Sequence, residues 1–349
     1  MALICLIVAS LFFYSWWNPI YFFLITFSIL VNFLIANLIH KYNYKIILII
    51  GILFNLILIG YFKYFNFFID IISFTSNIEF ITKQIILPLG ISFYTFQQIT
   101  FLVDIYNKKI NDLNFKNYTI FVTFFPQLIA GPIVHHSQVL HQFKNKFFLE
   151  DKIHYLTIGF SIFAIGLFKK VIIADNLSTY ASPIFFAADQ SMSLSFLEAW
   201  SGVLCYTFQL YFDFSGYSDM AVGLGYMFGI KLPINFNSPF KSTNVAEFWR
   251  SWHITLGIFI RNYVYYPISI FFTRVAIAKK RNAISNYLLT LIIPTLITYL
   301  LLGLWHGSGI NFILFGALHG IYIIIYNLWK RCEGKFIKNI YKKYVFTTY

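Results

Sequence analysis

Three histidines lie in or beside the apolar segments of the C-terminal half: His253, His306 and His319. His306 stands at the end of one long apolar segment, between Trp305 and Gly307, and His319 lies inside the next segment. An ionisable side chain at membrane depth is costly, so it usually lines a cavity or a pathway; the alternative is a core histidine bonded to a backbone carbonyl. A neutral imidazole can remove a proton near pH 7, so His306 is the first candidate for a general base.

A second polar group interrupts an apolar region over residues 213–219. It contributes Asp213, Ser215, Tyr217 and Asp219, where a spanning helix would carry no acids. These residues form either a polar interface loop or part of the lining of a cavity. Their spacing does not match a metal site, and we predict no metal.

Three classes of function remain open on these residues alone. An enzyme could use His306 as a general base in a channel-like cavity. A proton-coupled transporter could use His306 with Asp213 or Asp219 as a proton relay. A structural scaffold could simply bury these groups. Transporters are often built from repeats with paired broken helices, and the sequence shows no internal repeat.

The composition indicates that lipid is the solvent for much of the chain. Of 349 residues, 59% are hydrophobic and only 11% are charged, whereas soluble domains are typically about 25% charged. The net charge of +13 comes from Lys and Arg in loops between apolar segments, as the positive-inside rule expects. We therefore predict a multi-pass membrane protein that binds no nucleic acid.

The apolar segments are connected by short loops, and we predict one domain over residues 1–349. The segment 117–134 contains Pro126 and Pro132, and it lies between two basic loops. A segment that dips into the membrane and returns explains this pattern. Lys169 and Lys170 do not fit the scheme. The predicted segments are 2–17, 20–39, 46–69, 85–106, 117–134, 154–174, 196–212, 217–230, 286–305 and 309–329.

The pattern changes after residue 231. Asn244 is a good N-cap, and Glu247 follows three residues later, so a helix is predicted to begin there. On a continuous helix, an apolar face and a polar face separate, and His253 falls at the edge of the apolar face. We predict a helix lying along the membrane interface. The apolar face would carry Trp249, Trp252, Leu256 and Ile260, and the polar face Glu247, Arg250, Ser251, Arg261 and Asn262.

Five motifs occur in an order that resembles the membrane-bound O-acyltransferase family, in its bacterial branch of alginate O-acetylation and peptidoglycan O-acetyltransferase proteins. The resemblance covers roughly residues 9–325. The motifs are Leu87-Pro88-Leu89-Gly90-Ile91-Ser92-Phe93-Tyr94-Thr95-Phe96-Gln97, Phe125-Pro126-Gln127-Leu128-Ile129-Ala130-Gly131-Pro132-Ile133, Asp213-Phe214-Ser215-Gly216-Tyr217-Ser218-Asp219, Glu247-Phe248-Trp249-Arg250-Ser251-Trp252-His253-Ile254 and Leu304-Trp305-His306-Gly307.

The resemblance implies an all-α polytopic membrane protein, with about nine to eleven transmembrane helices and re-entrant elements around a central tunnel. It implies that His306 is the essential histidine and His253 the second histidine of the active site. Trp305, Arg250 and the polar residues of 213–219 are candidates for the substrate channel. Arg250 would either meet the anionic coenzyme or form a salt bridge at the membrane interface. The acyl donor would be acetyl-coenzyme A on the cytoplasmic side of a bacterial inner membrane. A periplasmic or extracellular partner protein would complete transfer to a polysaccharide acceptor.

The chain departs from the family pattern at two places. Family members often have Pro-Leu-Gly-Gly-Asn after the predicted interfacial helix, whereas Pro267 is followed here by Ile268-Ser269-Ile270-Phe271-Phe272. This favours peptidoglycan as the acceptor over alginate; D-alanyl transfer to teichoic acid and proton-coupled transport are the alternatives. Relative to the family, the chain also looks short at both ends.

Overall fold

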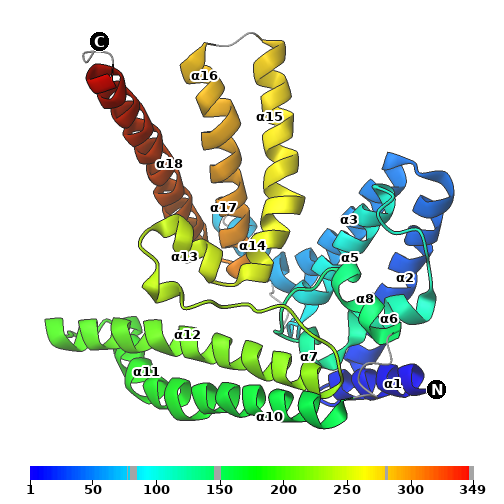
Figure 1. Ribbon diagram of the computed structural model, residues 1–349. Helices are drawn as coiled ribbons and strands as arrows, with labels where there is room; N and C mark the ends of the chain where they lie inside the picture. The colour runs from blue at the N-terminus through cyan, green and yellow to red at the C-terminus, as the bar shows by residue number, and fades with distance from the viewer. Residues whose placement is uncertain (77, 79–84, 145–150, 280–281, 346–349) are drawn as a thin grey trace. The chain divides into compact units, whose positions relative to one another are not determined.

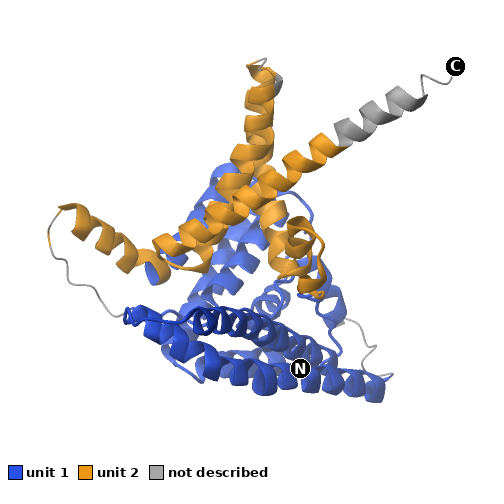
Figure 2. Cartoon of the chain, turned by 90° about the vertical axis from the view of Figure 1, so that its left-hand side faces the viewer, with its two compact units in different colours: residues 1–62, 85–236 blue, residues 63–84, 237–349 orange. Residues whose placement is uncertain are grey.

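The computed structural model describes residues 1–76, 78, 85–144, 151–279 and 282–345. Every regular element in this part of the chain is a helix (Figure 1), which confirms the predicted all-α fold. The chain separates into two compact units (Figure 2). Unit 1 comprises residues 1–62 and 85–236, and unit 2 comprises residues 63–84 and 237–349.

Five helices in the described residues are long and apolar enough to cross a membrane: Ile20–Tyr42, Lys45–Ser76, Lys152–Asp189, Ile284–His306 and Ile310–Glu333. A multi-pass arrangement is therefore supported. The number is lower than the predicted nine to eleven because several apolar segments form helices shorter than the roughly 20 residues that a span needs. Helix α1, for example, has 14 residues.

Unit 1 is built mainly from long apolar helices. It comprises α1 (Ala2–Ser15), α2 (Ile20–Tyr42), α3 (Lys45–Ile59), the start of the π-helical turn η1 (Gly60–Tyr64), α5 (Ile91–Tyr106), α6 (Phe115–Thr123), α7 (Phe125–Leu128), α8 (His136–Lys144), α10 (Lys152–Phe168), the π-helical turn η2 (Lys169–Ala174), α11 (Asp175–Asp189) and α12 (Phe196–Met227). Its core is aromatic and aliphatic, and includes the fully buried rings of Tyr14, Phe101 and Phe121.

The predicted broken segment 117–134 is broken in the structure. Helix α6 ends at Thr123, Phe124 is not helical, and the short helix α7 follows with Pro126 in its first turn. Proline fits the first turn of a helix because its missing N–H would have no intrahelical partner there. The break is thus confirmed, while entry into and return from a membrane stays a prediction.

Helices α10 and α12 run side by side in opposite directions (Figure 1) and approach through glycine. A Cβ atom added at Gly159 would lie 2.7 Å from the carbonyl oxygen of Gly223, and one added at Gly166 would lie 2.6 Å from that of Gly216. Small residues allow this close backbone approach in helices that pack in lipid.

The polar motif 213–219 lies within α12, which continues without a break from Phe196 to Met227. The predicted division into segments 196–212 and 217–230 is therefore wrong. The physical reason is charge pairing: Lys170 lies 2.7 Å from Asp213, and Lys169 lies 2.5 Å from Asp219. Paired charges make acids tolerable in an apolar helix.

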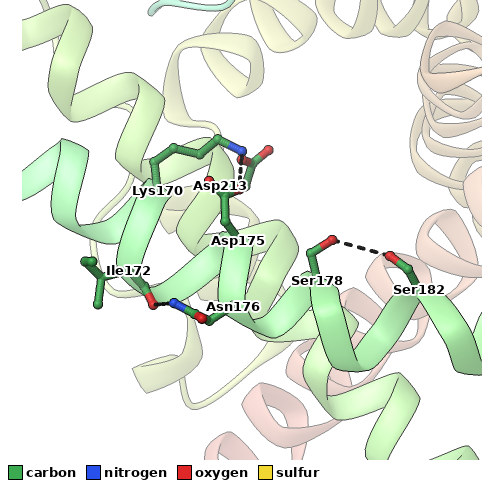
Figure 3. Close-up of polar contacts among 7 residues, drawn as sticks. All are labelled: Lys170, Ile172, Asp175, Asn176, Ser178, Ser182 and Asp213. Atoms are coloured by element: carbon green, nitrogen blue, oxygen red, sulfur yellow. Dashed lines mark hydrogen bonds and ion pairs between the residues drawn. The ribbon is translucent and has the colours of Figure 1, made fainter.

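The same contacts account for the two lysines that the charge pattern left unexplained. Lys170 also pairs with Asp175 at 2.6 Å, so one ammonium group bridges aspartates of α11 and α12 (Figure 3). Both lysines belong to η2, a π-helical turn between α10 and α11. The aspartates that pair with these two lysines also belong to unit 1.

Unit 2 contains the elements that carry the histidines. It comprises the end of η1, α4 (Phe65–Ser76), the 3₁₀ turn η3 (Pro239–Lys241), α13 (Val245–Ser251), α14 (Ile254–Ile260), the π-helical turn η4 (Arg261–Tyr265), α15 (Tyr266–Ala278), α16 (Ala283–Tyr287), the π-helical turn η5 (Leu288–Ile292), α17 (Ile293–His306) and α18 (Ile310–Val345).

Helices α17 and α18 cross in close contact. A Cβ atom added at Gly303 would overlap the carbonyl oxygen of Phe312 and lie 3.0 Å from the Cα atom of Gly316. One added at Gly316 would overlap the carbonyl oxygen of Tyr299. Only glycine fits at these two positions without moving a helix. The crossing fixes α17, which ends at His306.

Candidate active site

The predicted interfacial helix is two helices that meet at His253. Helix α13 ends at Ser251, Trp252 is extended, and His253 adopts the left-handed conformation with φ 44° before α14 begins. A histidine in this region is uncommon and costs about 1 kcal/mol or more. The prediction of one continuous helix is therefore wrong, because it assumed a regular backbone through residue 253.

The start of α13 agrees with its sequence signal. The side-chain oxygen of Asn244 accepts a hydrogen bond of 2.9 Å from the backbone N–H of Glu247. The Glu247 carboxylate accepts hydrogen bonds from the hydroxyl and backbone N–H of Thr243, and these hold the pKa of Glu247 below its usual value. The N-cap predicted at Asn244 is confirmed, and it fixes α13 up to the break.

A cavity of about 700 Å³ lies in unit 2 and is lined by residues on both sides of this break in the sequence. Its lining includes both His253 and His306, which lie 53 residues apart in the sequence. A volume in this range is typical of small-molecule sites. The four residues predicted on the apolar face also line it, namely Trp249, Trp252, Leu256 and Ile260.

The two histidines differ in their exposure. The side chain of His253 is buried, with 2% of its surface exposed. Burial, with His306 as a second and smaller cause, lowers the pKa of His253 to about 3. This ring is therefore neutral at pH 7. His306 is exposed and lines the cavity, so its ring can meet a molecule that enters.

Trp305 connects the two histidines. Its ring centroid lies 4.7 Å from that of His306 and 6.2 Å from that of His253. His306 also contacts the ring of Phe315, with the ring centroids 5.3 Å apart. The imidazole of His306 thus contacts two aromatic rings, which limits its orientation.

Two arginines from the predicted polar face line the same cavity, Arg250 from α13 and Arg261 from η4. Both are exposed. The predicted separation of these residues from the apolar set is wrong, because it assumed one continuous helix, whereas the chain breaks at Trp252 and His253 and both sets line one cavity. Guanidinium groups bind phosphate and carboxylate oxygens in pairs. The cavity therefore offers cations as well as histidines.

His319 lies beside this site on α18. Its ring is 4.5 Å from Phe315 and 4.8 Å, edge-on, from Trp249. Within the described residues, neither His319 Nδ1 nor Trp249 Nε1 has a hydrogen-bond partner, and both atoms are buried. The histidine of α18 is therefore part of the aromatic surroundings of the cavity.

Trp305, predicted for the channel, contacts both histidine rings but is not among the residues that line this cavity. The other predicted channel residues lie in unit 1 and do not line it either. Asp213 and Asp219 form the ion pairs described above, Ser215 is buried in α12, and Tyr217 is half-buried. In the part of the chain that the structure describes, no group of three or more His, Cys, Asp or Glu side chains could hold a metal ion.

Two residues near His306 were not predicted from the sequence. Lys63 donates a hydrogen bond to the carbonyl oxygen of Trp305, and Tyr64 donates one of 2.6 Å to that of Leu304. The available signal was Lys63 itself, the one charged residue in the apolar segment 46–69. An unexplained charge in such a segment is a functional hypothesis by default.

The fold and the site together define a multi-pass helical membrane protein with two histidines at one aromatic cavity. The chain belongs to the membrane-bound O-acyltransferase family, whose model matches residues 71–337. The matched region includes His253 and His306 and parts of both units.

The chain is also similar to individual members of the family whose names state a reaction. The chain is 42% identical to the peptidoglycan O-acetyltransferase of Helicobacter pylori, over 95% of this chain and 65% of that protein. It is 36% identical to a probable alginate O-acetylase of Pseudomonas aeruginosa, over 92% and 60%. It is 30% identical to the teichoic acid D-alanyltransferase of Bacillus subtilis, over 71% and 61%. The chain thus spans less than two thirds of the length of these relatives.

Proposed function

We propose that the chain is an O-acyltransferase that uses the cavity of unit 2 to move an acetyl group from acetyl-coenzyme A to a cell-wall polysaccharide, with peptidoglycan as the preferred acceptor. The observation that carries the proposal is the presence of His253 and His306 in the lining of one cavity. The family and the name of the relative from Helicobacter pylori support the reaction and the acceptor. The two units together would form one catalytic membrane domain.

His306 is the proposed general base. It removes the proton from an acceptor hydroxyl as the oxygen attacks the thioester carbonyl carbon. A C–O bond forms, the C–S bond breaks, and the thiolate takes up the proton that His306 received. The acetyl ester and free coenzyme A are the products. The exposure of His306 to the cavity suits a group that must touch a substrate.

His253 is proposed to orient the thioester or to stabilise negative charge on its carbonyl oxygen. Its backbone position, strained and buried, favours a fixed group over a mobile one. A neutral ring serves as a hydrogen-bond donor without carrying a full charge into a dry site. Trp305 is proposed to fix the positions of both imidazole rings through its ring contacts.

Arg250 and Arg261 are proposed to bind the phosphates of the donor. Both are exposed cations in the lining of the cavity, and guanidinium groups match phosphate geometry. We further propose a bacterial cytoplasmic membrane as the location and a periplasmic or extracellular partner that completes the transfer to the polysaccharide.

The test is the acetyl ester content of purified peptidoglycan in cells that carry His306→Ala as their only copy. We expect the base-labile acetate to fall at least about 10²-fold, the lower range for loss of a general base, at unchanged protein levels in the membrane. His141→Ala is the matched control, since His141 is an exposed histidine on α8 in unit 1. Undiminished ester in the His306→Ala cells would remove His306 from the reaction.

A transporter is the competing class. It predicts solute or proton flux in liposomes that contain no acyl donor. Flux without any consumption of acetyl-coenzyme A would exclude the proposed reaction. The ion pairs of Asp213 and Asp219 with lysines argue against a free carboxylate relay at these positions.

A further inference from the structure

The C-terminal end of α17 depends on another part of the chain for its hydrogen bonds. The last carbonyl groups of an α-helix have no partner within the helix. Many helices satisfy them with a left-handed residue directly after the last turn. Gly307 instead is extended, with φ −172°. The carbonyls of Leu304 and Trp305 need other donors, and His306 is the final residue of the same turn.

The donors come from η1, about 240 residues earlier in the chain. The hydroxyl of Tyr64 donates to the Leu304 carbonyl at 2.6 Å, and Nζ of Lys63 donates to the Trp305 carbonyl. The two consecutive side chains thus cap two consecutive carbonyls. Both donors and both acceptors belong to unit 2.

Lys63 adds a charge to this arrangement. Its ammonium group lies 5.5 Å from the ring centroid of Trp305 and 5.9 Å from that of Tyr64. A cation is favourable at the negative end of a helix dipole and over an aromatic face. Lys63 is half-buried and lies in an otherwise uncharged apolar segment, where a lysine is expensive. A π-helical turn is also common at functional sites.

We propose that Lys63 is a positioning residue for His306, with Tyr64 as its helper. Lys63 holds the carbonyl and the ring of Trp305, and thereby fixes the last turn of α17 and the direction of the His306 imidazole. The inference rests on the proposed role of His306 as the general base. Lys63 itself does not line the cavity, so it acts through Trp305 and not on the substrate.

The test measures transfer of radiolabelled acetyl from acetyl-coenzyme A into base-labile ester, in cell envelopes that contain the full chain. The variants are Lys63→Met, Lys63→Arg, Tyr64→Phe and the control Lys41→Met. Lys41 is matched because it also lies over an aromatic ring, at 4.9 Å from that of Tyr42, but in unit 1. Envelope levels of each protein and its thermal midpoint in detergent are measured in parallel.

We expect Lys63→Met to lower kcat by about 10²-fold, the loss that a displacement of about 1 Å causes, with KM for acetyl-coenzyme A within twofold. Lys63→Arg keeps the charge and the donor, so it should recover kcat to within about tenfold of the unchanged protein. Tyr64→Phe removes one hydroxyl and should lower kcat about fivefold, and Lys41→Met should leave both constants unchanged.

Two results would overturn the inference. One is an unchanged kcat in both Lys63→Met and Tyr64→Phe. The other is a loss in Lys63→Met that arginine does not rescue and that parallels a lower amount of folded protein, which would make Lys63 a stability residue only. His306→Ala separates this inference from the proposed function. If His306→Ala is inactive while Lys63→Met is normal, the positioning role fails and the general base stands; if His306→Ala is active, the proposed function fails.

Discussion

Gly303→Ala should impair the reaction without touching a substrate. The added methyl group would overlap the carbonyl oxygen of Phe312, so α17 and α18 must separate by roughly 1 Å to restore normal contact. Alanine gains about 1 kcal/mol over glycine in helix propensity, while overpacking costs about 1–3 kcal/mol. The net loss of stability is therefore modest, at most about 2 kcal/mol by these two magnitudes.

The effect on catalysis should be larger than the effect on stability. Gly303 lies one turn before His306, and a displacement of about 1 Å at a reacting group costs about 10²-fold in rate. The assay is acetyl transfer in cell envelopes, with the thermal midpoint in detergent as the measure of stability. Gly309→Ala is the control, because its Cβ would meet its nearest neighbour, Phe312 Cδ2, at an ordinary 3.8 Å. A Gly303→Ala protein with the unchanged rate and midpoint would refute the close crossing of α17 on α18.

Three further changes test other parts of the structure. Asn55→Leu breaks the reciprocal amide pair with Asn32, whose bonds are 2.6 and 3.2 Å. It should lower stability by about 1–3 kcal/mol because the buried side-chain oxygen of Asn32 loses its donor; an unchanged thermal midpoint would count against that pair. Lys170→Met should lower the midpoint because it leaves both Asp175 and Asp213 without this partner. Adding Asp213→Asn should restore part of the loss, since one of the two acids is then neutral; purely additive losses would argue against the ion pair. The pKa of His253 is about 3 in the folded protein and about 6.5 in an unfolded chain. The unfolded chain therefore binds the extra proton, and the free energy of unfolding should fall by up to about 1.4 kcal/mol per pH unit below pH 6.5. His253→Gln should reduce the resulting fall of the thermal midpoint between pH 7 and pH 5. An identical pH dependence in the variant would contradict the burial of a neutral ring.

The sequence was sufficient to predict the fold class, and two of the histidines that it singled out, His253 and His306, line one cavity. Long apolar segments require helices, because a backbone in lipid must satisfy its own hydrogen bonds. A titratable side chain at the end of such a segment is unusual enough to single out His306. The N-cap at Asn244 was also readable, since its side chain bonds locally.

The arrangement around the histidines was not readable from helical periodicity. The helical periodicity that separated Arg250 from Trp252 assumes one continuous helix, but α13 ends at Ser251 and His253 is left-handed. Left-handed residues are usually glycine or asparagine, so a histidine gives no warning. The backbone break then places both sets of side chains around one cavity.

The long-range partners were equally hidden. The acids of α12 looked like a loop because their lysines lie about 45 residues away in the sequence, and only the packing of α10 against α12 brings them together. Lys63 and Trp305 are 242 residues apart. A lone charge in an apolar segment indicates that the charge needs a partner. Which residue is that partner is determined by the tertiary structure.

The central claim is that acyl transfer takes place at the cavity shared by His253 and His306. The most direct measurement is the rate of labelled acetyl transfer from acetyl-coenzyme A into base-labile polysaccharide ester, in envelopes with the unchanged chain and with His306→Gln, which keeps a polar side chain of similar size. The account predicts a loss of at least about 10²-fold in kcat at equal protein levels. A His306→Gln protein that transfers acetyl at the unchanged rate would contradict it.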